Sequence, residues 1–210
     1  MMGKFITFEG PEGGGKSTHI KLLAEFLRAQ GKDVLVTREP GGTRLAELIR
    51  SLVREEIEDP PVVRSEVLLF LAARAQVVSN VIRPALEKGV WVLCDRFSDS
   101  TFAYQGYGRG IDVELLRQLN DFATQGLIPD MTILLDVPLE VSRSRLLERQ
   151  ANTNSSADRI EQAGEEFHRR LREGFLEMAK GAPQRFVVVD SSKELEAVNK
   201  NIEEAVLKLF

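Results

Sequence analysis

Five short apolar runs recur at wide intervals along the chain. They span residues 5–8, 34–36, 90–94, 133–137 and 186–189 and are rich in Val, Ile and Phe. Because the apolar positions are nearly continuous and do not alternate with polar ones, the runs are typical of strands covered on both faces of a parallel sheet. We therefore predict a five-stranded parallel sheet.

Longer segments with helical periodicity separate these runs. Residues 16–30 place Ile20, Leu23 and Leu27 on one face of a helix, and residues 62–86 carry a second apolar stripe. Further helices are predicted over residues 113–123, 139–149, 161–180 and 193–209. Strands that alternate with helices predict a doubly wound, three-layer α/β fold.

No internal repeat or long linker divides the 210 residues, so we predict one domain over residues 1–210. Residues 150–157 are polar, uncharged and aperiodic, and we interpret them as the tip of a mobile lid over about residues 143–160. The arginines of this region, which would close over phosphates, are Arg143, Arg145, Arg149 and Arg159. The alternatives are a surface loop without a role and a charged helix face.

The charge balance is slightly acidic, with 28 Lys and Arg against 32 Asp and Glu and a formal net charge of −4. This argues against nucleic acid and anionic membranes as partners, and any bound phosphate must be held locally. No targeting segment and no run of about 18 apolar residues is visible, so we expect a cytoplasmic protein. Cys94 is the single cysteine, which excludes an intramolecular disulfide.

The strongest motif lies between the first predicted strand and the first predicted helix. It fits G-x-x-x-x-G-K-[ST] and comprises Gly10, Pro11, Glu12, Gly13, Gly14, Gly15, Lys16 and Ser17. Glycines let backbone N–H groups wrap around phosphates, and the following helix presents its positive end to them. Lys16 would reach the outer phosphates, and the Ser17 hydroxyl would ligate Mg²⁺. The motif predicts a nucleoside triphosphate site; the alternative is an ordinary glycine-rich turn.

Charged residues follow two strands at the edge where ligands of such sheets bind. Asp95 and Arg96 follow the third apolar run, and Arg38 follows the second in a turn rich in Gly and Pro. Asp95 is suited to hold Mg²⁺ through water, and the two arginines could clamp a second phosphate because guanidinium matches phosphate oxygens in a bidentate way. Asp136 also ends a run, but it has no adjacent arginine and ranks below Asp95.

Other residues narrow the class of protein. No Asp is followed by Gly three positions later, which argues against a GTPase switch. Phe70 and Arg74 are four residues apart on the long helix, so the ring could stack on a base while the guanidinium binds its edge. The alternative is that Phe70 is core and Arg74 extends to the surface. His19 and His168 lie on predicted helices without companions, so they receive no catalytic role.

This series of motifs resembles that of the bacterial thymidylate kinases, a family of P-loop nucleoside monophosphate kinases. The matching elements cover nearly the whole chain and are residues 5–10, 38–43, 72–76, 95–97, 104–106 and 158–161. The resemblance implies phosphoryl transfer from ATP to dTMP with Mg²⁺, a homodimer, and a sheet with strand order 2-3-1-4-5.

The resemblance also implies roles for individual residues. Phe70 would stack on thymine, Arg74 and Thr101 would bind the base edge, and Arg38 and Arg96 would hold the dTMP phosphate. Tyr104 and Gln105 would complete the nucleoside pocket, with Glu12 near the acceptor sugar. The lid would supply a catalytic arginine, for which we choose Arg149, with Arg145 as the alternative.

The chemistry of the acceptor sets the expected mechanism. A phosphate monoester has a second pKa of about 6 and is already an anionic nucleophile at neutral pH, so no general base is required. Lys16, Arg96, a lid arginine and Mg²⁺ held near Asp95 would neutralise charge. Two alternatives are a deoxynucleoside kinase with Glu39 as the base, and a regulator that binds nucleotide without turnover.

Overall fold

The computed structural model describes residues 2–54, 58–153 and 163–210 of the chain. Five strands form one sheet in which every neighbouring pair is parallel, in the order β2-β3-β1-β4-β5. The strands are β1 (Phe5–Glu9), β2 (Val34–Arg38), β3 (Trp91–Asp95), β4 (Met131–Asp136) and β5 (Phe186–Asp190). All five lie on or within two residues of the predicted runs, and the strand order that the resemblance implied is confirmed.

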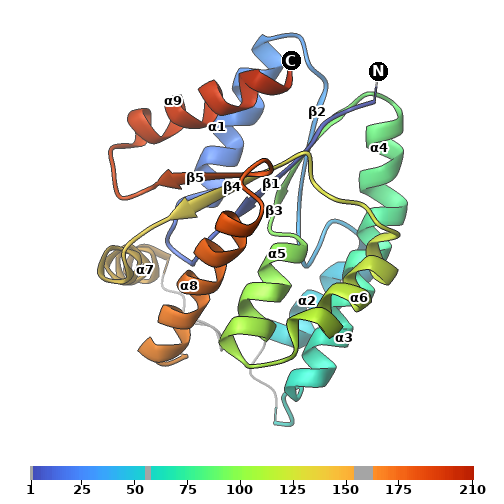
Figure 1. The fold of residues 1–210 in the computed structure, drawn as a ribbon, viewed down its shortest axis with the longest axis vertical. Helices are drawn as coiled ribbons and strands as arrows, with labels where there is room; N and C mark the ends of the chain where they lie inside the picture. Colours follow the sequence, from blue (N-terminus) through green and yellow to red (C-terminus); the bar gives the residue numbers. More distant parts are fainter. Residues whose placement is uncertain (1, 55–57, 154–162) are drawn as a thin grey trace.

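Helices cover both faces of this sheet and make three layers (Figure 1). The α-helices are α1 (Lys16–Ala29), α2 (Arg44–Arg54), α3 (Val63–Val77), α4 (Arg83–Glu87), α5 (Ser98–Thr101), α6 (Val113–Thr124), α7 (Leu139–Thr153), α8 (Glu165–Gly181) and α9 (Leu195–Val206). Shorter helical turns are η1 (Val78–Ile82) and η2 (Phe102–Gly108), which are π-helical, and η3 (Leu207–Leu209), a 3₁₀ turn.

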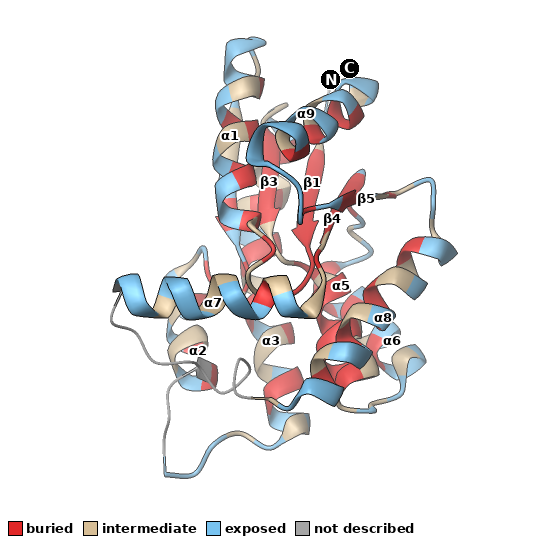
Figure 2. Ribbon diagram, turned by 90° about the vertical axis from the view of Figure 1, so that its left-hand side faces the viewer, coloured by how far each residue is buried: buried red, intermediate tan, exposed pale blue. Residues whose placement is uncertain are grey.

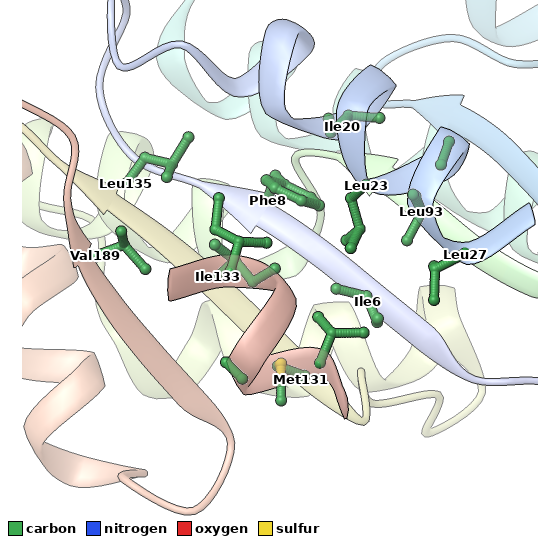
Figure 3. Packing of buried hydrophobic residues seen from close by; sticks show 14 of the residues in the cluster. Ile6, Phe8, Ile20, Leu23, Leu27, Leu93, Met131, Ile133, Leu135 and Val189 are labelled. Carbon is green, nitrogen blue, oxygen red and sulfur yellow. The ribbon is translucent and has the colours of Figure 1, made fainter. Parts of the chain in front are cut away.

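The first face of the sheet is covered by α1 and α9, and it holds the largest apolar cluster of the described residues. In Figure 3, Leu23 and Leu27 of α1 lie over Ile6 and Phe8 of β1, with Ile133 of β4 beside them. All five side chains are fully buried. Burying one large aliphatic or aromatic side chain contributes roughly 1.5–3 kcal/mol, so this contact fixes α1, and with it the loop that precedes α1, on the sheet.

The second face is covered by η1 and α4, by α5 and η2, and by α8. The helix α3 extends away from the sheet, and α2 and α6 pack on it (Figure 1). Within the described part of the chain, Val63–Glu87 is the one helical stretch long and apolar enough to cross a membrane, with 44% of its most apolar window buried. Core helices of soluble proteins pass the same test. Here Val78 and Ile82 pack against Phe5 and Val92 of the sheet, as in a core helix.

The helix predicted over residues 62–86 is correct in extent but not in regularity. Its π-helical turn at η1 precedes Pro84, which lies in the first turn of α4. Proline has no N–H to donate to the preceding turn and its ring crowds the carbonyl there, so a local widening accommodates it.

Two helical segments were not predicted, namely α2 and the continuous pair α5 and η2. A further difference concerns residues 150–153, which continue α7 to Thr153 and are not a loop. The remainder of the predicted lid tip, with Arg159, lies outside the described residues.

The carboxyl ends of the strands share one edge of the sheet, because all the strands are parallel. In Figure 2, α7 crosses this edge below the buried strands. The loops after β1 and β3, which carry Gly10 to Gly15 and Arg96, open at the same edge.

Candidate active site

The loop between β1 and α1 requires glycine at specific positions. Gly10 has φ +126°, and a Cβ there would lie 2.4 Å from the carbonyl oxygen of Leu135. Gly13 has φ +72°, and a Cβ there would lie 2.7 Å from the carbonyl oxygen of Ser142 on α7. Both positions combine a left-handed backbone with a backbone neighbour that closes the space, so the loop takes a shape that other residues cannot adopt without strain.

Lys16 begins α1 with its side chain folded back over this loop. Its Nζ donates to the carbonyl oxygen of Pro11 at 2.8 Å and to that of Gly10 at 3.1 Å. Burial lowers the pKa of Lys16 to about 8. The Lys16 ammonium is thus held against the glycine-rich loop, whose backbone geometry suits the binding of phosphate oxygens.

Ser17 and Asp95 meet across the edge of the sheet, where the Ser17 hydroxyl donates to Oδ2 of Asp95 at 3.0 Å. Both offer hard oxygen atoms, which suit Mg²⁺, and a bound triphosphate would supply further oxygens. The pair therefore fits a magnesium ion that arrives with a nucleotide. No cluster of three or more His, Cys, Asp or Glu among the described residues would hold a metal by protein ligands alone.

Arg96 follows β3 in a left-handed conformation with φ +70°, which is uncommon for a residue other than glycine. This backbone turns the guanidinium back towards the glycine-rich loop. Nη2 donates to Glu12 at 2.7 Å, and Nη1 donates to the carbonyl oxygen of Gly10 at 3.0 Å and to Ser100 at 3.1 Å. Strained backbone of this kind concentrates at functional sites, because the surrounding contacts must hold it in place.

Glu12 accepts hydrogen bonds from two sides. The Tyr104 hydroxyl lies 2.7 and 2.8 Å from its two carboxylate oxygens, opposite Arg96. Burial alone would raise the pKa of Glu12, but the charges of Arg96 and Lys16 and the hydrogen bond from Tyr104 outweigh it and lower the pKa below its ordinary value. Glu12 is therefore a fixed acceptor between the glycine-rich loop and η2.

Glu9, which sequence reasoning did not single out, is bound to residues that follow Arg96. Its Oε1 accepts from the backbone N–H of Phe97 at 2.8 Å, and its Oε2 accepts from the Ser100 hydroxyl. Burial, followed by the charge of Asp99, raises the pKa of Glu9 to about 7. An acidic residue at the end of an apolar run is the signal that could have marked it.

Arg74 is 3% exposed, so the alternative in which it extends to the surface is wrong. Its Nε donates to Glu39 at 2.7 Å, its Nη2 donates to the carbonyl oxygen of Phe97 at 3.0 Å, and its Nη1 donates to Thr101 at 2.8 Å and to Asn120. A guanidinium has five N–H donors. Within the described part of the chain four are used, and one on Nη2 is left for a ligand.

Phe70 lies one turn before Arg74 on α3 and is half-buried. Its ring packs on the apolar cluster between α2 and α3, which contains Ala46 and Ile49. Gln105, one turn beyond Thr101, is buried on the facing η2 and donates to Glu66 at 2.9 Å. The fold thus brings together the predicted base-binding residues of α3 with those of α5 and η2.

Arg38 ends β2 as predicted, but its side chain is 54% exposed. Its Nη2 donates to both carboxylate oxygens of Glu47 on α2, each at 3.0 Å. Glu39, the alternative general base, is the buried partner of Arg74, and burial raises its pKa. Asp136 has no arginine next to it in the sequence, but in the structure Arg172 of α8 donates to its two carboxylate oxygens at 2.6 and 2.8 Å.

The helix α7 is joined to the glycine-rich loop by two side chains. Ser142 donates to the carbonyl oxygen of Glu12 at 2.7 Å, and Arg145 donates to those of Gly13 at 3.4 Å and Ser191 at 2.9 Å. Arg149 lies one turn further along the same helix. Glu12 also lines a cavity of about 300 Å³ between α7 and α8, together with Arg143, Leu146 and His168.

The comparisons with known proteins agree on one family. The sequence profile of the thymidylate kinase family matches residues 8–202 of the chain. A thymidylate kinase from Pseudomonas fluorescens is 48% identical over 210 residues, which are 100% of this chain and 98% of that protein. One from Pelotomaculum thermopropionicum is 49% identical over 202 residues, 96% of this chain and 92% of that protein. The crystal structure of a thymidylate kinase from Ehrlichia chaffeensis superposes with a TM-score of 0.79 at 35% identity, covering 98% and 100% of the two chains.

Proposed function

This chain belongs to the thymidylate kinase family and phosphorylates dTMP to dTDP with ATP. We propose that each of the two substrates has its own binding site. The glycine-rich loop, residues 10–17, binds the triphosphate of ATP. The space between α3 and the pair α5 and η2 binds dTMP. The two sites meet at Arg96 and Glu12, which are hydrogen-bonded to each other.

The arrangement of Arg74 carries this proposal. Four of its donors are bound to protein, which orients the fifth, and Thr101 lies 2.8 Å from its Nη1. Thymine presents carbonyl oxygens on both sides of an N–H, so a fixed guanidinium donor beside a hydroxyl matches one end of that edge. The Phe70 ring, half-buried on the same helix, offers an apolar face on which the base stacks.

Arg96 holds the dTMP phosphate near Glu12 and Tyr104. Its guanidinium is already aimed at the glycine-rich loop, so little ordering is needed when the substrate binds. Arg38 binds the same phosphate by exchanging Glu47 for it. That exchange is feasible because the pair is more than one-third exposed on both sides and such pairs are worth about 0–1 kcal/mol.

Phosphoryl transfer on this site requires positioning and charge neutralisation. The acceptor phosphate is anionic at neutral pH, so its oxygen attacks the γ-phosphorus without loss of a proton to the protein, and the bond from the γ-phosphorus to the bridging oxygen breaks to release ADP. Lys16 binds the triphosphate oxygens in exchange for its carbonyl partners, and Arg96 orients the acceptor. Ser17 and, through water, Asp95 would hold Mg²⁺, which would neutralise charge on the transferring phosphates.

Arg149 supplies the remaining positive charge from α7. Arg145 is bound to the carbonyl oxygens of Gly13 and Ser191, which suits it to shape the ATP site. The two assignments separate by mutation, because Arg149→Ala lowers kcat at unchanged KM for ATP, whereas Arg145→Ala raises KM for ATP.

The protein acts as a cytoplasmic homodimer. Leucines 45, 48 and 52 lie on one side of α2 with 48%, 57% and 48% of their surface exposed, a row that a second copy would bury. Light scattering on the wild type and on Leu48→Glu tests this. The wild type has twice the mass of the chain and the variant elutes as a monomer; a monomeric wild type refutes the homodimer.

The substrate assignment is tested with purified protein, ATP and Mg²⁺ against dTMP, dUMP, CMP, AMP and thymidine. dTMP gives ADP fastest, whereas preference for thymidine itself supports the deoxynucleoside kinase instead. Lys16→Ala abolishes turnover and leaves the Kd of dTMP nearly unchanged. A parallel loss of dTMP binding means that the two sites are wrongly divided, and nucleotide binding without ADP formation in the wild type supports the regulator.

A further inference from the structure

Glu66 on α3 is a buried carboxylate beside the proposed base pocket. Only 1% of the residue is exposed, and its Oε1 accepts a hydrogen bond from Nε2 of Gln105 at 2.9 Å. The Nε of Arg109, a buried atom without a hydrogen bond to any of the described residues, lies 3.6 Å from the same oxygen. An acidic side chain is rarely buried to this extent unless charged and hydrogen-bonding partners accompany it.

Two cross-links join the helices that border the pocket. Glu66, Phe70 and Arg74 follow one another at intervals of four residues along one side of α3. Thr101 and Gln105 are likewise four residues apart on the facing α5 and η2. Arg74 bonds to Thr101 and Glu66 bonds to Gln105, so Phe70 lies between the two cross-links. A base stacked on Phe70 therefore has Arg74 at one end of its edge and Gln105 towards the other.

The Glu66 carboxylate fixes the orientation of the Gln105 side-chain amide. A carboxylate oxygen only accepts, so it selects the amide nitrogen of Gln105, and the carbonyl oxygen Oε1 lies on the other branch of the planar amide. Arg109 reinforces this choice because its positive charge favours an acceptor at Glu66. Without Glu66, the two orientations of the amide would present opposite hydrogen-bonding groups to the base.

We propose that Glu66 is a positioning residue for base selection, which holds Gln105 so that its Oε1 accepts the N3–H of a pyrimidine ring. This inference rests on the proposed binding of dTMP between α3 and η2. Thymine and uracil carry a hydrogen on N3, whereas cytosine has a lone pair there that would face Oε1. Glu66 thereby selects bases with N3–H and acts through Gln105, without touching the substrate.

The test compares the Kd values of dTMP, dUMP and dCMP by titration calorimetry. In Glu66→Met the ratio of the Kd of dCMP to that of dTMP falls about tenfold, the effect of one matched hydrogen bond of ordinary strength. Glu66→Gln offers a donor as well as an acceptor, so it fixes the Gln105 amide less firmly and gives a ratio between those of Glu66→Met and the wild type. The ratio of dUMP to dTMP stays unchanged in both variants, because both bases carry N3–H.

A second pair of variants shows whether Glu66 acts through Gln105. Gln105→Met lowers the dCMP to dTMP ratio by the same factor, and Glu66→Met adds no further loss in that background. Asp130→Asn is the control, because this carboxylate also binds a lysine and a backbone N–H, at 3.0 and 2.8 Å, but at the opposite end of β1 from the glycine-rich loop. It leaves all three Kd values unchanged.

If Glu66 contributes to stability alone, its variants bind all three nucleotides more weakly by the same factor and the ratios of the Kd values do not change. That result overturns the inference. Should Glu66→Met fail to fold, Glu66→Gln takes its place, and an unchanged dCMP to dTMP ratio in that variant or in Gln105→Met refutes the inference. If the wild type forms no dTDP from dTMP and ATP, the proposed function has failed. If the wild type forms dTDP normally and the variants keep the ratio of the Kd of dCMP to that of dTMP, only the proposed role of Glu66 is refuted.

Discussion

The ion pair between Arg74 and Glu39 gives the sharpest prediction, because the same side chain supports the fold and the base pocket. The two side chains are 3% and 4% exposed, and Nε lies 2.7 Å from Oε2. Arg74→Ala leaves Glu39 buried without its partner, and breaking such a pair costs about 3–5 kcal/mol of unfolding free energy. For a chain of this size that lowers Tm by roughly 6–20 °C, at about 2–4 °C per kcal/mol.

A double variant separates the two roles of Arg74. Arg74→Met with Glu39→Leu removes both charges, so no unpaired carboxylate is left and much of the lost stability returns. Binding does not return, because neither new side chain donates to a base. The KM for dTMP therefore stays at least tenfold raised, the effect of one hydrogen bond from a charged donor, while the KM for ATP changes little.

Urea unfolding and steady-state kinetics provide the two measurements. Arg172→Ala is the matched control for stability, because its pair with Asp136 has a donor that is 38% exposed and is worth about 1 kcal/mol or less. A loss below about 1 kcal/mol in Arg74→Ala would refute the assignment of Arg74 as a buried structural cation. Equal increases in the KM values of ATP and dTMP would instead refute its place in the base pocket.

Three further predictions follow from the described geometry. Burial raises the pKa of Glu9 to about 7, so the folded state holds its proton more tightly than the unfolded chain; unfolding free energy relative to Glu9→Gln falls by about 2 kcal/mol from pH 5.5 to 8.5, and a flat difference in urea melts contradicts this. Gly13→Ala must place a Cβ 2.7 Å from the carbonyl oxygen of Ser142 at φ +72°. The strain of about 1–3 kcal/mol weakens ATP binding about 5- to 150-fold and leaves dTMP binding unchanged. A normal ATP affinity would show that the loop relaxes. Chelation of divalent ions abolishes turnover and Mg²⁺ restores it, because Ser17 and Asp95 offer only oxygen atoms; activity in excess chelator would exclude the metal role of this pair.

Local patterns identified most of the architecture. The strands were predictable because central strands of a parallel sheet are apolar on both faces, as β1 and β4 are. The helix α2 was not predicted although Leu45, Leu48, Ile49 and Leu52 repeat at helical intervals, because it is short and follows a turn rich in Gly and Pro, a composition typical of loops. The segment of α5 and η2 was missed because its polar and small residues carry no apolar stripe.

The sequence by itself determined the glycine-rich loop, the charged residues at the ends of the strands and the pairing of Phe70 with Arg74, since each depends on residues close together in the chain. Only the tertiary structure decided which partners those residues have. Arg74 is bound to Glu39, just after β2, and to Asn120 on α6, and Glu66 is bound to Gln105, 39 positions later in the sequence. Such contacts are set by how helices pack on the sheet, which periodicity does not encode. Burial then turns the same carboxylates into fixed acceptors by removing the water that would otherwise compete for them.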